Sequence, residues 1–77
     1  MENKDSYTPQ EVFEIARVYT QFIKSRDSTR NTSDAAKKLT YAETALFNAE
    51  RIPQNIIEAG RHMDEIKELE EIVRNSR

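Results

Sequence analysis

The 77-residue sequence contains no cysteine and no tryptophan, and it has only one glycine, two prolines and one histidine. Without cysteine it can form neither a disulfide nor a thiolate metal site, and one histidine leaves few ligands for structural zinc. So few glycines and prolines allow few turns, which favours helices over a sheet. The sequence therefore predicts one small all-α domain that covers residues 1–77.

Long apolar runs are also missing. No stretch approaches the roughly 20 residues of a membrane span, and the polar residues 1–5 contain no signal-peptide core. We therefore expect a cytoplasmic protein with no membrane partner, located in the host cell cytoplasm if a phage encodes it. A net charge of −2 argues against binding to duplex nucleic acid. The basic residues are concentrated in residues 24–42, which hold five bases and two acids.

A first helix is predicted over residues 9–26. Thr8 suits the N-cap, Pro9 the first helical position, and Glu11 completes a capping box. Apolar side chains then recur at steps of three and four and predict one buried face, which comprises Val12, Ile15, Ala16, Tyr19, Phe22 and Ile23. Residues 27–32 lack apolar side chains and are predicted to form a loop.

A second, longer helix is predicted over residues 33–75, capped by Thr32 or Ser33. Its first part has a narrow seam of small and apolar residues, namely Ala35, Leu39, Ala42, Leu46 and Ala49. Pro53 removes a helical hydrogen bond and should kink or break the helix. Beyond it, apolar residues continue as a stripe from Ile56 to Val73.

The lengths of the two helices bear on assembly. At ~1.5 Å per residue the first helix spans roughly 27 Å and the second roughly 64 Å, so the stripe from Ile56 to Val73 would have no partner within the chain. Either the chain folds back at Pro53 into a three-helix bundle, or a long kinked helix buries its stripe against other copies. No glycine and no good N-cap directly precede Pro53. The sequence therefore favours a helical hairpin, kinked or broken near Pro53, that forms a homo-oligomer.

Catalytic signatures are missing from the sequence. It has neither a glycine-rich phosphate loop nor a recognisable nucleophile–histidine–acid motif, and it implies no cofactor. Glu58, His62 and Glu65 would share one helical face and could bind a metal, but a solvated face of a charged helix explains them better. We therefore predict a protein that is not an enzyme and binds no metal.

A polar line on the second helix is the main candidate for a binding site. It consists of Lys37, Tyr41, Thr44, Asn48 and Arg51, at steps of four and three. Cations and hydroxyls can bind phosphates, and an aromatic ring can stack on a base. Arg26 and Arg30 precede this helix, and Tyr7 could add a second stacking ring. In the alternative interpretation the line is an ordinary solvated face, and Tyr7 packs against Val12.

The run Thr40-x-Ala42-x-Thr44-x-Leu46-x-x-Ala49 resembles the second helix of a family of helical-hairpin phage proteins. These are the anti-CBASS and anti-Thoeris sponges, which sequester cyclic-nucleotide immune messengers. The resemblance implies an oligomer that binds cyclic di- or trinucleotides between its subunits and hydrolyses nothing. Two features depart from that family. The stretch before the first helix shares only its proline with the usual Phe-Asn-Pro-Ser-Gly, and Arg51-Ile52 replaces a Met-Trp pair.

Two functions follow as hypotheses. The first is a sponge for a cyclic oligonucleotide that counters bacterial anti-phage defence, with a ligand site made of Tyr7, Arg26, Arg30, Lys37, Tyr41 and Thr44. The second is a helical protein-interaction module or inhibitor that docks its stripe from Ile56 to Val73 on a protein partner.

Overall fold

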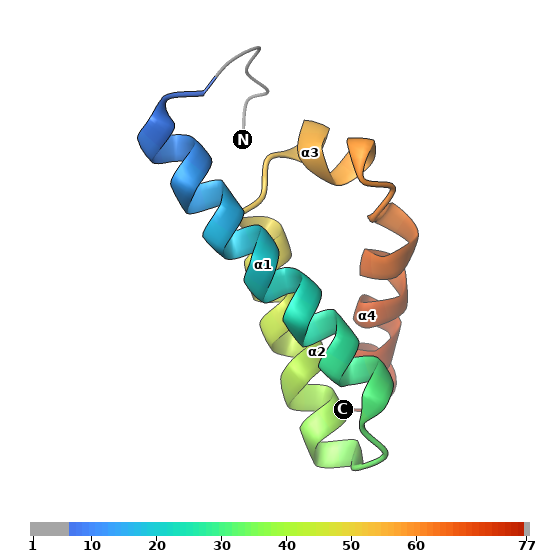
Figure 1. Cartoon of the computed structure of the whole chain (residues 1–77). Helices are drawn as coiled ribbons and strands as arrows, with labels where there is room; N and C mark the ends of the chain where they lie inside the picture. The colour runs from blue at the N-terminus through green and yellow to red at the C-terminus, as the bar shows by residue number, and fades with distance from the viewer. Residues whose placement is uncertain (1–6, 77) are drawn as a thin grey trace.

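A computed structural model describes residues 7–76 of the chain. Residues 1–6 and 77 of the predicted domain, which include the polar start that argued against a signal peptide, lie outside the described residues. Four helices are present, namely α1 (Pro9–Asn31), α2 (Ala35–Glu50), α3 (Gln54–Ala59) and α4 (Met63–Asn75). Helices α1 and α2 form an antiparallel pair, α3 crosses one end, and α4 returns along α2 (Figure 1). Residues 7–76 contain no strand, which confirms the predicted all-α class.

The start of α1 is as predicted. The Thr8 hydroxyl accepts the backbone N–H of Glu11 at 3.2 Å, and the Glu11 carboxylate accepts the N–H of Thr8 at 3.0 Å. These two bonds satisfy helix-end donors reciprocally, and Pro9 occupies the first helical position. The predicted capping box is therefore confirmed.

The predicted end of the first helix at residue 26 and the loop over 27–32 are wrong, because α1 continues to Asn31. Ser25 and Thr29 are buried on its last turns, and the Thr29 hydroxyl donates to the carbonyl oxygen of Ser25 at 2.7 Å. The polar segment stays helical here with Ser25 and Thr29 buried, and the Thr29 hydroxyl is satisfied within its own helix. The connection to α2 is short. The N-cap of α2 is Asp34, and not Thr32 or Ser33 as predicted. The Asp34 carboxylate accepts the N–H of Lys37 at 3.0 Å.

The core between α1 and α2 combines large side chains from one helix with alanines from the other. Val18 and Phe22 of α1 are buried against the alanines of α2, which are Ala42, Ala45 and Ala49. Small residues let the two backbones approach closely. The predicted seam is only partly right, because Ala42 and Ala49 are buried but Ala35 is exposed and Leu39 and Leu46 are half-buried. The buried Ala45 was not part of the prediction.

The predicted α1 stripe is only partly right, because Val12 and Ala16 are exposed. The buried residues of α1 are Val18, Phe22, Ser25 and Thr29 instead. The N-terminal part of the predicted stripe, at Val12 and Ala16, faces solvent.

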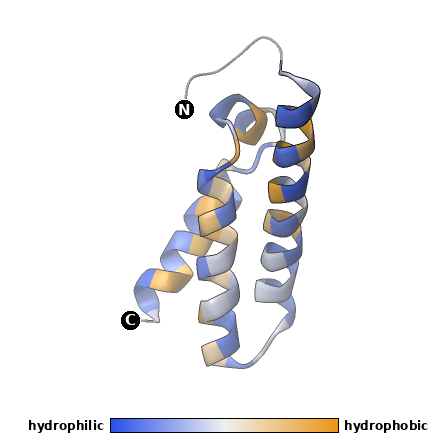
Figure 2. Ribbon diagram, turned by 90° about the vertical axis from the view of Figure 1, so that its left-hand side faces the viewer, coloured by the Kyte–Doolittle hydropathy of each residue, from blue (hydrophilic) through white to orange (hydrophobic). Residues whose placement is uncertain are grey.

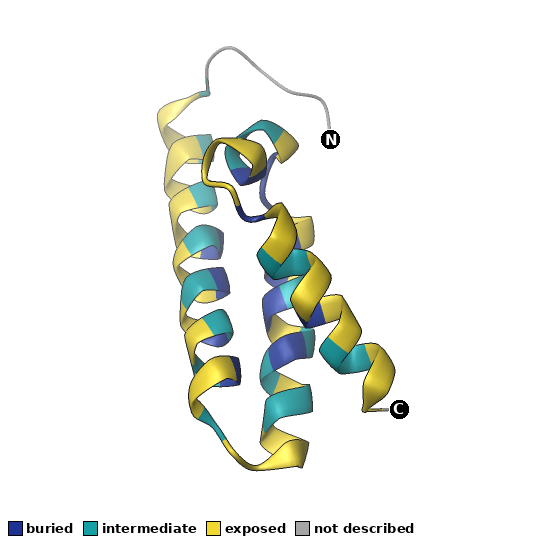
Figure 3. Ribbon diagram, turned by 90° about the vertical axis from the view of Figure 1, so that its right-hand side faces the viewer, coloured by how far each residue is buried: buried dark blue, intermediate teal, exposed yellow. Residues whose placement is uncertain are grey.

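The single long helix predicted over residues 33–75 is wrong. Helix α2 ends at Glu50, and the chain reverses so that α4 packs against α2 (Figure 3). Leu69 is buried and Ile66 packs beside it, so the stripe from Ile56 to Val73 has a partner within the chain after all. The alternative of a bundle folded back at Pro53 is the one observed. Burial of Ile52 and Pro53, rather than local turn chemistry, stabilises the reversal.

A second turn between α3 and α4 completes the reversal. The carbonyl of Ile57 accepts the N–H of His62, and the carbonyl of Glu58 accepts the N–H of Arg61, both at 3.0 Å. These two bonds define a Schellman motif, whose left-handed position usually holds glycine. Here that position is Arg61, with φ of 58°, whereas the neighbouring Gly60 has a right-handed φ of −82°.

Replacement of Arg61 by glycine should therefore stabilise the protein. The arginine side chain is exposed and makes no salt bridge within residues 7–76, so little contact energy is lost. Relief of the left-handed strain on an L-residue should raise the free energy of unfolding by about 1 kcal/mol. Urea denaturation of Arg61→Gly measures this change. Arg61→Ala is the matched control, and a stabilisation of the same size in that variant would contradict the explanation.

Candidate functional site

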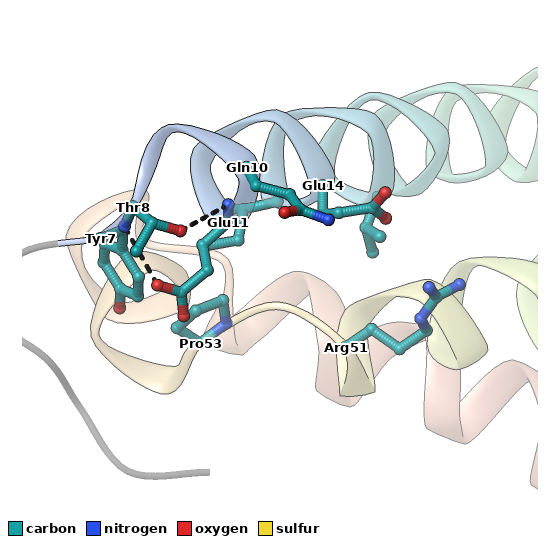
Figure 4. Close-up of a pocket in the computed structure, with 9 residues that line it drawn as sticks. Tyr7, Thr8, Gln10, Glu11, Glu14, Arg51 and Pro53 are labelled. Atoms are coloured by element: carbon teal, nitrogen blue, oxygen red, sulfur yellow. Dashed lines mark hydrogen bonds between the residues drawn. The ribbon is translucent and has the colours of Figure 1, made fainter.

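An open groove runs between the N-terminal half of α1 and the C-terminal end of α2. It consists of two adjoining hollows of about 390 and 420 Å³, which share Glu14, Val18 and Arg51. The first hollow lies at the start of α1, where Tyr7 and Pro53 close its end (Figure 4). The side chains of Glu14 and Arg51 extend from opposite walls of this hollow. The groove therefore combines an apolar floor with charged groups on both walls.

Two phenylalanines near the groove are largely exposed, and of the two only Phe13 lines a hollow. Phe13 on α1 is 64% exposed and Phe47 on α2 is 61% exposed. The Arg51 guanidinium lies over the Phe47 ring, 5.9 Å from its centroid, and Phe13 lines the same hollow as Arg51. We call the surface formed by Phe13, Arg17, Gln21, Phe47, Asn48 and Arg51 the groove face. It belongs to the α1–α2 side of the molecule, with α4 behind (Figure 2).

Three of the predicted ligand residues lie on one line that leads to the groove face. Lys37 and Thr44 are exposed on α2, and Tyr41 is half-buried between them. The spacing that joins them continues to Asn48 and Arg51, which line the groove. The structure therefore brings Lys37, Tyr41 and Thr44 together on one side of α2.

The other three predicted ligand residues lie elsewhere. Arg26 and Arg30 of α1 point to α4, where Arg26 Nη1 lies 2.9 Å from Glu65 Oε2 and Arg30 Nη2 lies 3.9 Å from Glu68 Oε2. Tyr7 lies at the far end of the groove, and its hydroxyl donates to Asn55 Oδ1 at 3.2 Å. The six residues do not form one site within a single chain, because helix α4, folded back beside α1, pairs with both arginines.

The richest polar network connects α1 to the start of α4. His62 is buried, and its ring makes edge-to-face contacts with Tyr19 and Phe22 at centroid distances of 5.4 Å. Nδ1 of the ring donates to the Glu65 carboxylate oxygen Oε2 at 3.0 Å, and Nε2 is hydrogen-bonded to the Tyr19 hydroxyl. The same Glu65 oxygen accepts a bond from Arg26. Both ring nitrogens are thus occupied, and the network joins α1 to the start of α4.

Burial and hydrogen bonding act in opposite directions on Glu65. Burial disfavours the charged carboxylate, but hydrogen bonds from Arg26 and His62 outweigh it and hold the pKa of Glu65 below its usual value of about 4.5. A carboxyl whose pKa is lower in the folded state binds its proton more readily when unfolded. Its contribution to stability is therefore complete above pH 4.5 and is lost as the pH falls through the folded-state pKa.

Glu65→Gln should remove this contribution. At pH 6 the variant should be less stable than the wild type by about 1–2 kcal/mol, because the amide oxygen that replaces the carboxylate accepts from Arg26 and His62 without a negative charge. The difference should shrink as the pH falls below about 4.5 and through the lower folded-state pKa of Glu65. Melting curves followed by circular dichroism test this, with Glu71→Gln on the exposed side of α4 as control. A difference that is independent of pH would contradict the assigned role of Glu65.

The possible metal cluster of Glu58, His62 and Glu65 is not assembled. Glu58 lies on α3, where its Oε1 is 3.4 Å from Gln54 Nε2, whereas Glu65 lies on α4 and binds Arg26. No group of three histidine, aspartate or glutamate side chains that could bind a metal occurs among residues 7–76. The one contact of the cluster that forms, between His62 and Glu65, belongs to the network described above.

No protein-family model, no curated protein and no solved structure matches the chain. None of the helices in the described part is long and apolar enough to cross a membrane. The run from Thr40 to Ala49, which carries the resemblance to the sponges, lies within α2. The sponge family therefore remains a prediction from that run.

The sequence pattern pointed to part of the groove face and missed the rest. Arg51 and Asn48 belong to the predicted polar line, whereas Phe13 is not among the residues of the predicted α1 stripe. Phe47 was not singled out, although it stands between polar residues on the helix side opposite the alanine seam. A large aromatic at such a position is a usable signal, because exposed aromatics gather at binding surfaces.

Proposed function

We propose that this protein is a non-catalytic interaction module that docks a protein partner on the groove face. The observation that carries the proposal is the pair of exposed phenylalanines, Phe13 and Phe47, beside the Arg51 guanidinium. Aromatic and arginine side chains contribute most of the binding energy at many protein interfaces. Neither ring contributes to the core of the monomer, so a partner that covers them explains their presence.

The shape of the groove supports a protein partner. Small ligands bind in concave sites that bury most of their surface, whereas this groove is open along its length. The surface first considered for docking, the stripe from Ile56 to Val73, packs largely into the monomer's own core. We therefore propose the groove face, and not the stripe on α4, as the docking surface.

Selection from a display library of random 14-residue peptides tests this proposal. We expect wild-type protein to enrich peptides that bind Phe13→Ser or Phe47→Ser at least tenfold more weakly. Both variants should keep the wild-type melting temperature, because the two rings are exposed. Met63→Ser, which changes an exposed apolar residue on α4, is the control and should leave binding unchanged. Enriched peptides that tolerate both phenylalanine substitutions, or a selection without binders, would refute the proposal.

A second candidate is the predicted sponge for a cyclic oligonucleotide. The observation in its favour is that Lys37, Tyr41 and Thr44 lie on one side of α2, in line with Asn48 and Arg51 of the groove face. Cations, hydroxyls and rings in that order suit phosphates and bases. Because the groove is open, a second copy of the chain would have to cover the ligand. The predicted homo-oligomer therefore belongs to this candidate.

Melting curves with a panel of cyclic di- and trinucleotides separate the two candidates. A sponge should melt several degrees higher with one of them, through linkage between binding and folding. Lys37→Ala should then weaken binding about tenfold, because a charge-assisted bond to phosphate is lost. Lys67→Ala on α4 is the control. If no nucleotide raises the melting temperature, the sponge is excluded and protein docking stands alone.

A further inference from the structure

A third hollow, separate from the groove face, lies between α2 and α4, which pack side by side (Figure 3). Its volume is about 230 Å³, and Ala49 and Ile57 are buried in its lining. The rest of the lining consists of the apolar Leu46, Met63 and Ile66 and the polar Glu50, Gln54 and Glu70. Within residues 7–76, the charged groups of this lining are therefore two carboxylates and no cation.

Neither carboxylate of the α2–α4 hollow has a charged partner in the described part of the chain. The side chains of Glu50 and Glu70 form no salt bridge and no hydrogen bond there. Arg51 follows Glu50 in the chain, but its guanidinium lies over a phenylalanine ring. Lys67 and Arg74 lie on α4 about one turn before and after Glu70, but neither lines the hollow or forms a salt bridge within residues 7–76. The negative charge of the hollow favours a cationic occupant.

Glu50 also stands where the helix itself disfavours a carboxylate. It is the last residue of α2, and the last turn of α2 contains no basic residue. The C-terminal end of a helix carries partial negative charge, which repels an acidic side chain and attracts a cation. A cation bound beside Glu50 would therefore offset two repulsions, one from the helix end and one from Glu70.

The size and the lining of the hollow point to one long side chain as its occupant. Sites for whole small molecules usually enclose ~300–1,000 Å³, more than this hollow offers. The methylenes of an arginine can cover apolar side chains such as Leu46 and Ile66, while its charged end stays at the rim. A guanidinium has five donors in one plane and is more weakly hydrated than an ammonium. It can therefore bind carboxylates from two helices at once, which favours arginine over lysine.

We infer that the α2–α4 hollow binds an arginine side chain of a protein partner, with the guanidinium between Glu50 and Glu70. The methylenes of that arginine would cover Leu46, Met63 and Ile66. This surface is separate from the groove face, so the inference goes beyond the docking proposed there and does not depend on it.

Titration of isotope-labelled protein with N-butylguanidinium, which reproduces the arginine side chain, tests this inference. The amide signals of Ala49, Ile57 and Ile66 should shift, with a dissociation constant of the order of 1–10 mM, because one side chain supplies little binding energy. N-Butylurea, its neutral analogue, should bind at least tenfold more weakly. A pentapeptide of glycines with a central arginine and capped ends should bind at least as tightly as N-butylguanidinium, because the hollow is open to a peptide backbone.

Substitution of the two carboxylates locates the cation. Glu50→Gln and Glu70→Gln should each weaken the binding of N-butylguanidinium at least threefold, and the double variant should bind it no better than N-butylurea. Glu71→Gln makes the same charge change on the exposed side of α4 and should leave the binding unchanged. Glu50→Gln should also melt at the wild-type temperature or slightly above it, since repulsion at the end of α2 is relieved. Loss of binding in that variant is therefore not loss of folding.

Several results would overturn the inference. Equal binding of N-butylguanidinium and N-butylurea would show an apolar hollow without cation selectivity, and an equal loss in Glu71→Gln would show diffuse attraction by net charge. Spermidine that binds tenfold more tightly than the pentapeptide would assign the hollow to a free polyamine. Shifts of the same amide signals on dilution of the protein alone would assign it to a second copy of the chain.

The same titration separates this inference from the docking proposed for the groove face. Phe13→Ser should bind N-butylguanidinium as the wild type does, because Phe13 does not line the α2–α4 hollow. A loss of binding in Phe13→Ser would place the cation on the groove face and overturn the inference. Absence of any shift in the wild type would also overturn it and would leave the groove-face proposal untouched.

Discussion

Phe22→Ala is expected to lower the free energy of unfolding by about 3–5 kcal/mol, the range for removal of a large buried aromatic. The Phe22 side chain is fully buried, where it packs with Val18 and the α2 alanines and contacts the His62 ring. Alanine would leave a cavity where α1, α2 and α4 meet. Small domains have few kcal/mol of stability to lose, so much of the protein should be unfolded at 37 °C. Urea denaturation at 10 °C measures the change.

Phe13→Ala provides the matched control, because it makes the same substitution in the same helix. The ring of Phe13 is largely exposed, so its removal should change stability by no more than about 0.5 kcal/mol. The two variants should affect binding in the opposite order. Phe13→Ala should weaken partner binding, whereas Phe22→Ala should act only through folding. Equal losses of stability would mean that Phe22 does not anchor the junction of the three helices.

Gly60→Ala is expected to destabilise the protein by about 1–3 kcal/mol, as overpacking of a tight site does. A β-carbon at this position would lie 2.6 Å from two atoms of the His62 ring and 3.2 Å from the Tyr19 hydroxyl. His62 is buried and hydrogen-bonded at both nitrogens, so its ring cannot move away freely. The substitution should therefore disrupt the Tyr19–His62–Glu65 network. Thermal melting of the variant measures the loss.

A double-mutant cycle isolates this cause. In a His62→Ala background the ring is gone, so Gly60→Ala should cost little or even stabilise the end of α3 through the better helix propensity of alanine. The same loss in both backgrounds would refute the clash and point to a backbone effect. Gly60 occupies the position that the His62 ring approaches closely, whereas Arg61 occupies the strained left-handed position.

The groove face also shows how far the sequence leads toward a function. Helical spacing alone placed Asn48 and Arg51 on one line, and both line the groove. Arg26 and Arg30 looked equally suitable for an anionic ligand, since both belong to the basic segment 24–42. Their assignment to the α4 side depended on acids about 40 residues further along the chain. No local sequence pattern indicates which basic residues will form ion pairs with acids of a distant helix.

Local interactions account for the features that the sequence predicts correctly. The capping box of Thr8 and Glu11 and the helical class depend on neighbours within a few residues, so the sequence predicts them. Of the predicted seam, Ala42 and Ala49 are buried. Tertiary structure decided the rest. Helix α1 continues beyond its last apolar residue because Ser25 and Thr29 are buried in the folded chain. The chain reverses at Pro53 because burial of Ile57 and Leu69 against distant residues outweighs weak turn signals. Such contacts depend on residues far apart in the chain, and only the folded chain brings them together.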